Sequence, residues 1–368
     1  MKQKINILIN DEARRLGLYY GYWNWFFLFQ KELLDQEIKV NFFSKINQNF
    51  FDADHLFLNS RSFPNINDRV DLDNLKKIYL KNKNLYWFDM RDSAGTTQFE
   101  VLPFVKKYIK KQFYKDKTIY KKKLEGGRFY TDHYIKKYKI KDHKSYDQEL
   151  LDIQYLPKLI LGWNLGVAFF FDYLNFSKID YFLELLKFKY LNIKDYKMKL
   201  QFYQNWEDDK KKYDFFSLMN TNFYRASVGF QRIRLKENLR SISNENKFIS
   251  GRLNKKNYYK TLRNSKVSIG AYGWGEVCYR EFESIMSGTP FMTANMENIE
   301  TWPNIYHEGE TYLSYSLDFK NLKNNLDILI KDLNLRKKLV KNSKLILQDC
   351  HADEGKNYFL RKINEIIK

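Results

Sequence analysis

Short apolar runs alternate with longer amphipathic segments along most of the chain. Runs rich in β-branched and aromatic residues, bounded by turn-forming residues, are typical of buried strands. In the first half the pattern predicts strands over 5–9, 38–43, 55–58, 85–88 and 159–166, and helices over 23–34 and 99–114. The second of these helices is amphipathic and basic. Strands that alternate with helices favour an α/β domain around a parallel sheet.

The second half shows the same alternation. It predicts a first strand over 199–203 or 215–219, later strands over 248–252, 267–271 and 312–315, and helices over 258–264, 322–330, 333–347 and 358–367. A chain of 368 residues is long for one core, so we expect two domains. We expect an amino-terminal domain at 1–175 and a carboxyl-terminal domain at 198–350. A linker helix at 176–197 would join them, and a terminal helix at 351–368 would follow.

The segment 266–294 combines a strand, a glycine loop, a helix and a second strand. Its first apolar run ends at Gly273-Trp274-Gly275, and glycines at the carboxyl end of a strand let the backbone approach a ligand closely. The predicted helix has an apolar stripe of Cys278, Phe282, Ile285 and Met286, and a polar face of Arg280, Glu283, Ser284 and Ser287. Gly288 is placed to end this helix as a left-handed cap.

The start of this helix suits an anion. Its free N–H groups and the positive end of its dipole attract negative charge, and Arg280 adds a permanent bidentate donor, which together fit a diphosphate. Glu283 repels phosphate but can accept hydrogen bonds from two ribose hydroxyls. The combination indicates a sugar nucleotide. An ordinary β-α-β unit with a capping glycine is the alternative interpretation.

The block from Glu283 to Pro290, ESIMSGTP, resembles the E-A-x-x-x-G-x-P segment of GT-B glycosyltransferases. Arg280 with Glu283 resembles the R-x-x-E variant of exostosin-like members, and the sequences GWGE and YREFE are similar to a bacterial and viral group of glycosyltransferase-like proteins. The resemblance implies two Rossmann-like domains that face a cleft, with a terminal helix that crosses back to the first domain. It also implies a nucleotide-sugar in the second domain and an acceptor in the first.

The resemblance assigns roles to individual residues of the second half. Glu283 would hold the donor ribose, and the donor site would comprise Gly273, Trp274, Gly275, Glu276, Arg280 and Glu283, with a basic contact to the diphosphate from Arg225, Arg232 or Arg234. Many retaining members carry a first glutamate eight positions before the second. This chain has Gly275 there and Glu276 one position later, so retention or inversion stays open.

The loop 89–97 is the strongest candidate site of the first half. Asp89 and Asp92 follow a predicted strand, and two carboxylates at a strand end suit a catalytic general base, although a capped turn explains the same residues. The expected acceptor contacts are Arg14, Arg15, Ser93, Asp132 and His133. A histidine beside tyrosines is also compatible with a purely structural role.

The formal net charge is +20, from 64 Lys and Arg against 44 Asp and Glu, which predicts attraction to polyanions. The lysine runs between Lys106 and Lys123 suit an anionic membrane surface, although a solvated basic face is the plainer explanation. No nucleic-acid-binding motif is present, so nucleic acid is not an expected partner. The two cysteines fit neither a disulfide framework nor a metal site. With no secretory signal, we expect a cytoplasmic protein, at most peripheral on the inner membrane face.

These patterns, with the resemblance, predict a glycosyltransferase. It would move a sugar from a nucleotide-sugar to a glycan or a lipid-linked acceptor in surface polysaccharide assembly. Because GT-B enzymes usually stabilise the leaving diphosphate with a helix dipole and basic side chains, no metal or other cofactor is expected. The alternatives are a non-catalytic polyanion-binding protein and a GT-B nucleotide-sugar epimerase.

Overall fold

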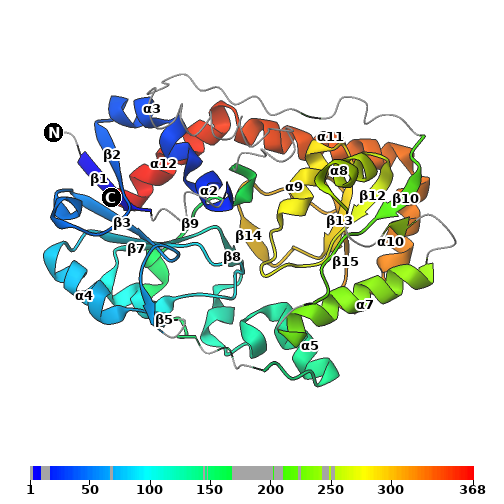
Figure 1. The fold of residues 1–368 in the computed structure, drawn as a ribbon, viewed down its shortest axis with the longest axis horizontal. Helices are drawn as coiled ribbons and strands as arrows, with labels where there is room; N and C mark the ends of the chain where they lie inside the picture. Colours follow the sequence, from blue (N-terminus) through cyan, green and yellow to red (C-terminus); the bar gives the residue numbers. More distant parts are fainter. Residues whose placement is uncertain are drawn as a thin grey trace.

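Two parallel sheets, each flanked by helices, lie at opposite ends of the molecule, with a small antiparallel sheet between them (Figure 1). The computed structural model describes residues 3–9, 17–66, 69–143, 146, 148–167, 202, 210–222, 225–242, 248–249 and 253–368. The arrangement confirms the expected α/β class with two Rossmann-like halves.

The first sheet has six parallel strands in the order β2-β1-β3-β6-β7-β9. They are β1 (Gln3–Leu8), β2 (Ile38–Phe43), β3 (His55–Asn59), β6 (Leu85–Asp89), β7 (Lys107–Lys110) and β9 (Leu159–Leu161). In β6, Leu85 and Trp87 enter one core and Tyr86 and Phe88 the other. Both faces are therefore buried, which is typical of parallel sheets. The flanking helices are α2 (Gly17–Leu28), α3 (Gln30–Asp35) and α4 (Leu72–Lys81).

The second sheet has five parallel strands in the order β11-β10-β12-β13-β15. They are β10 (Tyr213–Phe216), β11 (Phe248–Ile249), β12 (Ser265–Ile269), β13 (Phe291–Ala294) and β15 (Leu313–Tyr315). The accompanying helices are α7 (Ala226–Ile242), α8 (Lys255–Arg263), α9 (Tyr279–Met286), α10 (Leu322–Lys331) and α11 (Leu333–Cys350). Gly288 has a φ of 66°, so the predicted left-handed residue after α9 is confirmed.

The small central sheet joins the halves through their backbones. Strand β8 (Gln112–Tyr114) of the first half pairs antiparallel with β14 (Ile299–Thr301) of the second. The Thr301 hydroxyl also donates to the Lys111 carbonyl at 2.9 Å. Helix α5 (Phe129–Tyr138) of the first half packs on α7, where the ring of Phe230 meets two tyrosines of α5. The two halves are therefore connected by strand pairing, by a side-chain hydrogen bond and by helix packing.

The remaining described elements are short. They are the antiparallel pair β4 (Asn65–Ile66) and β5 (Arg69–Val70), and 3-10 helices over Gln48–Phe51, Phe99–Phe104, Lys117–Lys121, Glu125–Gly127, Ile153–Lys158 and Leu165–Val167.

The terminal helix α12 (Asp353–Ile367) returns to the first half, as expected, and lies beside α2 in Figure 1. The ring of Phe359, which is fully buried, lies 5.6 Å from that of Trp25 and 5.0 Å from that of Phe26. The Tyr358 hydroxyl donates to the Gly162 carbonyl at 2.9 Å. The carboxyl end of the chain thus completes the core of the first half.

The prediction of a basic helix over 99–114 is wrong. The segment forms a 3-10 helix around Pro103, then β7 and β8. Lys110 is fully buried on β7, where its ammonium lies 2.7 Å from the Asp89 carboxylate. The lysine spacing was compatible with a helix, but this tertiary ion pair and the aromatic neighbours favour a strand.

The basic surface is correspondingly smaller than predicted. Lys110 and Lys111 are buried, whereas Lys106 and Lys121–Lys123 are exposed. Contact of these exposed lysines with an anionic membrane stays a prediction. Among the described helices, none has the length and apolar character needed to cross a bilayer.

Two other predicted helices, over 23–34 and 176–197, have different outcomes. The helix expected over 23–34 is divided at Phe29 into α2 and α3. The linker helix expected over 176–197 lies outside the described residues, so the domain limits stay predictions.

We predict that Phe359→Ala destabilises the protein by about 3–5 kcal/mol, because it removes a ring from a close-packed aromatic core. Denaturant unfolding will measure the loss, with exposed Arg361→Ala as the matched control on the same helix. Equal stability of the two variants would show that α12 is not part of the first core.

Candidate functional site

The strand order of each sheet reverses at one point along its carboxyl edge. In doubly wound sheets, ligands bind outside the carboxyl ends of the strands where the order reverses. In the second sheet this point lies between β10 and β12, which lead into the loops 217–222 and 270–278. In the first sheet it lies between β1 and β3.

Arg232 lies between the two loops of the second sheet. From α7, its Nε donates to the Tyr272 carbonyl at 3.1 Å and its Nη1 to the Asn220 carbonyl at 3.0 Å. The side chain is buried. Burial and the nearby charge of Arg280 lower the pKa of Arg232. Both the helix and the loops are therefore needed to hold this cation in place.

Arg280 approaches the same edge of the second sheet from the first turn of α9. A side chain at position 270 would place its Cβ 2.1 Å from Arg280 Nη1, so Gly270 leaves the space that the guanidinium fills. This Nη1 is buried and has no hydrogen-bond partner within the described part of the chain. Burial acts to lower the pKa of Arg280, but Cys278 and Glu281 outweigh it and raise the pKa. Two like charges and an unused donor form a site suited to an anion.

Glu283 is half-buried one turn further along α9. Its Oε2 accepts a hydrogen bond from the Tyr258 hydroxyl and its Oε1 one from the Tyr259 hydroxyl, each at 2.8 Å. A carboxylate oxygen can accept more than one hydrogen bond, so these contacts orient Glu283 without exhausting its acceptor capacity. The prediction that Arg280 and Glu283 lie on one helix is confirmed. The contact of Glu283 with a ribose stays a prediction.

The glycine loop is packed against the first half. A Cβ at Gly275 would lie 1.7 Å from the Asp92 carbonyl oxygen, so this position requires glycine because protein backbone approaches it. Arg128 Nε donates to the Trp274 carbonyl at 2.8 Å, and the Tyr130 hydroxyl to the Gly273 carbonyl at 2.8 Å. The loop therefore forms part of the contact between the halves.

Glu276 makes the central bonds of this contact. Its carboxylate accepts from the Ser93 hydroxyl at 2.7 Å, the Ala94 N–H at 2.9 Å and Gln112 Nε2 at 2.6 Å. Burial raises its pKa, although the hydrogen bonds from Ala94 and Ser93 oppose the shift. Ser93 and Glu276, predicted for acceptor and donor, are thus brought together and bonded to each other. Their direct contacts with substrates stay predictions.

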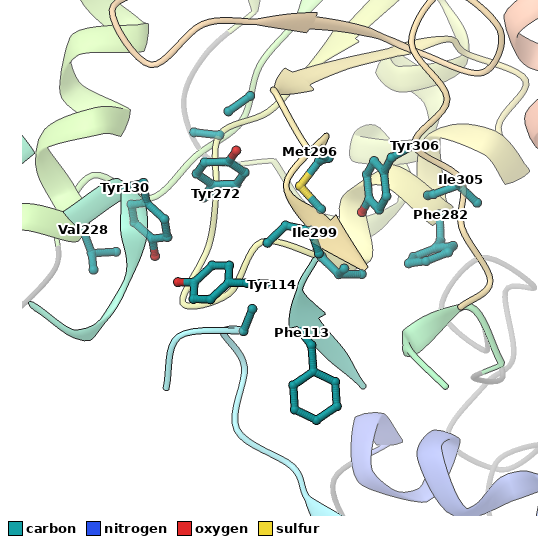
Figure 2. Close-up of a cluster of buried hydrophobic side chains, with 14 of the residues drawn as sticks. Phe113, Tyr114, Tyr130, Val228, Tyr272, Phe282, Met296, Ile299, Ile305 and Tyr306 are labelled. Atoms are coloured by element: carbon teal, nitrogen blue, oxygen red, sulfur yellow. The ribbon is translucent and has the colours of Figure 1, made fainter. Parts of the chain in front are cut away.

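Aromatic side chains surround the same contact. Figure 2 shows Tyr114 and Tyr130 of the first half gathered with Tyr272 and Ile299 of the second in one buried cluster. The rings of Tyr130 and Tyr272 are 4.9 Å apart. Apolar burial therefore reinforces the polar bonds that fix the loops.

The two candidate catalytic aspartates have different surroundings. Asp89 is fully buried and binds Lys110 and the Tyr108 hydroxyl. Asp92 is 45% exposed, with Oδ1 3.0 Å from Lys111 Nζ and Oδ2 3.5 Å from Arg61 Nη2. Burial acts to raise the pKa of Asp92, but Lys111 and Arg61 outweigh it and lower the pKa. Of this pair, Asp92 is accessible to solvent and Asp89 is not.

The other residues predicted to contact the donor or the acceptor contact residues of the protein itself. Arg225 lies over the Tyr146 ring at 5.2 Å, with a buried Nη1 that has no hydrogen-bond partner in the described ranges, whereas exposed Arg234 pairs with Glu237. Asp132 accepts from the Glu125 N–H and pairs with Lys136, which favours a structural role on α5.

His133 has a half-buried ring beside Tyr134, and burial and Lys137 lower its pKa. Its acceptor contact stays a prediction. Arg14 and Arg15 lie outside the described residues.

Sequence reasoning missed several residues of the site, namely Arg61, Lys111, Gln112, Arg128, Tyr130, Tyr258, Tyr259 and Glu281. Most occur in segments without a recognisable motif, and Lys111 was assigned to a helix that does not form. Gly126-Gly127 before Arg128 was the one local signal of an unusual backbone, and both glycines have positive φ. Within the described ranges, no group of three His, Cys, Asp or Glu side chains is placed to hold a metal ion.

No family model matches the sequence, and no curated protein matches it. Among solved structures, the chain is similar to a glycosyltransferase from Rickettsia africae ESF-5, with 13% identity, 100% of this chain and 98% of that chain covered, and a TM-score of 0.45. It is also similar to HepE of Anabaena in complex with UDP-glucose, with 11% identity, 99% of each chain covered and a TM-score of 0.42. A third similar structure is an alpha-glucosyltransferase in complex with UDP-glucose and DNA containing an abasic site, with 10% identity, both chains covered at 100% and a TM-score of 0.45. These likenesses are remote.

Glu281, the neighbour of Arg280 on α9, is expected to make the stability of the protein depend on pH. It is buried, its Oε2 accepts from the Cys278 N–H at 2.9 Å, and burial raises its pKa from 4.5 to about 7 against the opposing effect of Arg280. Between these two values the native state holds a proton that the unfolded chain has released. The stabilising contribution is thus fully present below the unfolded pKa and is lost as the pH rises through the folded pKa.

We predict that Glu281→Gln removes this dependence. The free energy of unfolding of the wild type, relative to the variant, should fall between about pH 5 and pH 8 by up to about 1.4 kcal/mol per pH unit. Denaturant titrations at both pH values measure it. If the difference in unfolding free energy between the two proteins does not change with pH, Glu281 does not titrate in this range.

Proposed function

We propose that the protein is a glycosyltransferase that binds the diphosphate of a nucleotide-sugar between Arg232 and Arg280. The observation that carries the proposal is the convergence of these two guanidinium groups at the reversal point of the second sheet, with Arg280 Nη1 buried and lacking a partner in the described part of the chain. Buried like charges repel each other, so a bound anion would relieve the repulsion. The resemblance of the block 283–290 to the GT-B segment supports a sugar nucleotide as this anion.

Glycosyl transfer uses both halves. An acceptor hydroxyl attacks the anomeric carbon of the donor, the bond from that carbon to the diphosphate oxygen breaks, and the nucleoside diphosphate leaves. Arg232 and Arg280 stabilise the negative charge that develops on the leaving group. Asp92, half-exposed at the contact between the halves, is the candidate base for the proton of the acceptor, whereas Asp89 holds the Asp92 loop in place through Lys110.

The remaining assignments extend this proposal. Glu283, oriented by Tyr258 and Tyr259, accepts hydrogen bonds from the donor ribose. The glycine loop 273–275 lies between the donor and the acceptor, and Glu276 holds this loop against the first half. The acceptor is a glycan or a lipid-linked sugar of surface polysaccharide assembly, and the arginines make a metal ion dispensable.

We predict that Arg280→Ala weakens nucleoside diphosphate binding by about 1.5–3 kcal/mol, because a charge-assisted contact is lost. A panel of UDP, GDP, CDP and ADP is first tested by thermal shift, and the best ligand is then titrated by calorimetry. Arg234→Ala is the matched control, since Arg234 is exposed and pairs within its own helix. Unchanged affinity in folded Arg280→Ala protein contradicts the donor site.

A second prediction separates the ribose from the phosphates. Glu283→Gln keeps the shape but removes the charge that favours hydroxyl donors, so affinity for the nucleoside diphosphate should fall while affinity for inorganic pyrophosphate is kept. Calorimetry with both ligands makes the comparison. Equal loss for the two ligands would mean that Glu283 only supports the loop.

A further inference from the structure

Helix α4 is held to the first half by one side only. Its first turn is capped by Asp71, whose side chain accepts from the Asn74 N–H at 3.0 Å. Leu75 and Ile78 are buried and join the core on one side of the first sheet. The opposite side of the helix is open to solvent, so its composition is free to serve another purpose.

This open side combines apolar and basic side chains. Over the range 72–83 the exposed residues are two leucines, four lysines and one aspartate, namely Leu72, Asp73, Lys76, Lys77, Leu80, Lys81 and Lys83. We call this set the α4 face. Leu72 is 36% exposed and Leu80 is 65% exposed. Because Leu72, Lys76 and Leu80 recur at intervals of four residues, they form one stripe along the helix.

The carboxyl end of α4 holds two of these lysines above aromatic rings. Lys81 Nζ lies 4.6 Å from the centroid of the Phe51 ring, and Lys83 Nζ lies 3.7 Å from that of the Tyr79 ring. Both rings are half-buried. A cation–π contact orients an ammonium group without neutralising it, so the positive charge stays beside exposed Leu80.

Helix stabilisation explains only part of this composition. A lysine in the last turn, such as Lys81, is favoured by the helix dipole, whereas Lys76 and Lys77 lie in the middle of α4, where the dipole has little effect. Four lysines against one aspartate give the α4 face a formal charge of +3. Two copies of this face would therefore repel each other, and the complementary surface is an anionic one.

The α4 face also lies apart from both candidate sites. In Figure 1, α4 is at the outer end of the first half, away from the second sheet. The helix connects β3 with β6, which are neighbouring parallel strands, so its axis runs back along the sheet and its outer side lies beside the carboxyl edge. A surface that contacts the α4 face would leave this edge open.

We propose that the α4 face docks on an anionic lipid surface. Leu72 and Leu80 insert among the headgroups, and the lysines lie against the lipid phosphates. Interfacial helices combine apolar and basic side chains in this way, with the lysine stems on the apolar part and the ammonium groups in the polar layer. Nucleic acid would use the lysines but not the leucines. The docking does not depend on the proposed glycosyltransferase function.

Sedimentation of the full-length protein with vesicles tests the charges. Vesicles of equal parts phosphatidylcholine and phosphatidylglycerol should bind the protein at low salt and release most of it at high salt, because salt screens the lysines. Vesicles of phosphatidylcholine alone should bind it weakly. Lys76→Gln combined with Lys77→Gln should lower the partition coefficient by about tenfold or more. Glutamine is as good a helix former as lysine, so this double variant is expected to fold.

The leucines are tested by a second substitution. Leu80→Ala should lower partitioning onto the anionic vesicles by about threefold or more, because fewer methylene groups leave water. The matched control is Leu345→Ala, since Leu345 is also exposed, at 46%, but belongs to α11 of the second half. This control should bind the vesicles as the wild type does.

The charges have a matched control as well. Lys323→Gln combined with Lys341→Gln removes two exposed lysines from α10 and α11 and should change partitioning little. Equal losses in the two double variants would show that net charge attracts the vesicles, which overturns the proposal, as would failure to sediment with anionic vesicles. Unchanged partitioning of Leu80→Ala, with binding to double-stranded DNA that depends on Lys76 and Lys77, would identify nucleic acid as the partner and also overturn it.

Discussion

The relative position of the two halves depends on the buried carboxylate of Glu276. It accepts three hydrogen bonds, all from the first half, although Glu276 itself belongs to the second. An isolated buried carboxylate costs several kcal/mol, so a structure in which these donors were displaced would be strongly disfavoured. Gly275 makes the approach sterically feasible, because any side chain there would overlap the Asp92 backbone. One polar contact and one missing side chain thus let these two loops of the halves approach closely.

This contact brings the two candidate sites together. The loop that carries Glu276 leads into the helix of Arg280, and the loop that supplies its donors carries Asp92. Any donor held by Arg232 and Arg280 would therefore be presented near the groups that follow the strands of the first sheet. The strand pair β8–β14 and the contacts of the Phe129 and Tyr130 rings with Tyr272 also join the two halves. This geometry supports the proposed division into a donor half and an acceptor half.

The net charge of the chain acts in two different ways. Some cations are neutralised inside the fold, as Lys110 is by Asp89, and these contribute to structure. Others lie beside a like charge, as Arg232 lies near Arg280. Arg280 Nη1 has no hydrogen-bond partner in the described part of the chain, so it can donate to a negatively charged ligand. Total charge alone does not distinguish these cases, because the distinction depends on tertiary partners.

The sequence by itself determined the α/β class, the strands at 38–43 and 85–88, and the helix bearing Arg280 and Glu283, because hydrophobic period and glycine capping are local properties. It also indicated the two loops that meet at Glu276. Only the tertiary structure decided that 107–114 forms strands, since Lys110 finds its counter-charge on β6, and that Gly275 serves a backbone contact. Likewise, Arg61, Lys111 and Asp92 share one site because parallel strands place residues distant in sequence at the same edge, a relation that no local pattern encodes.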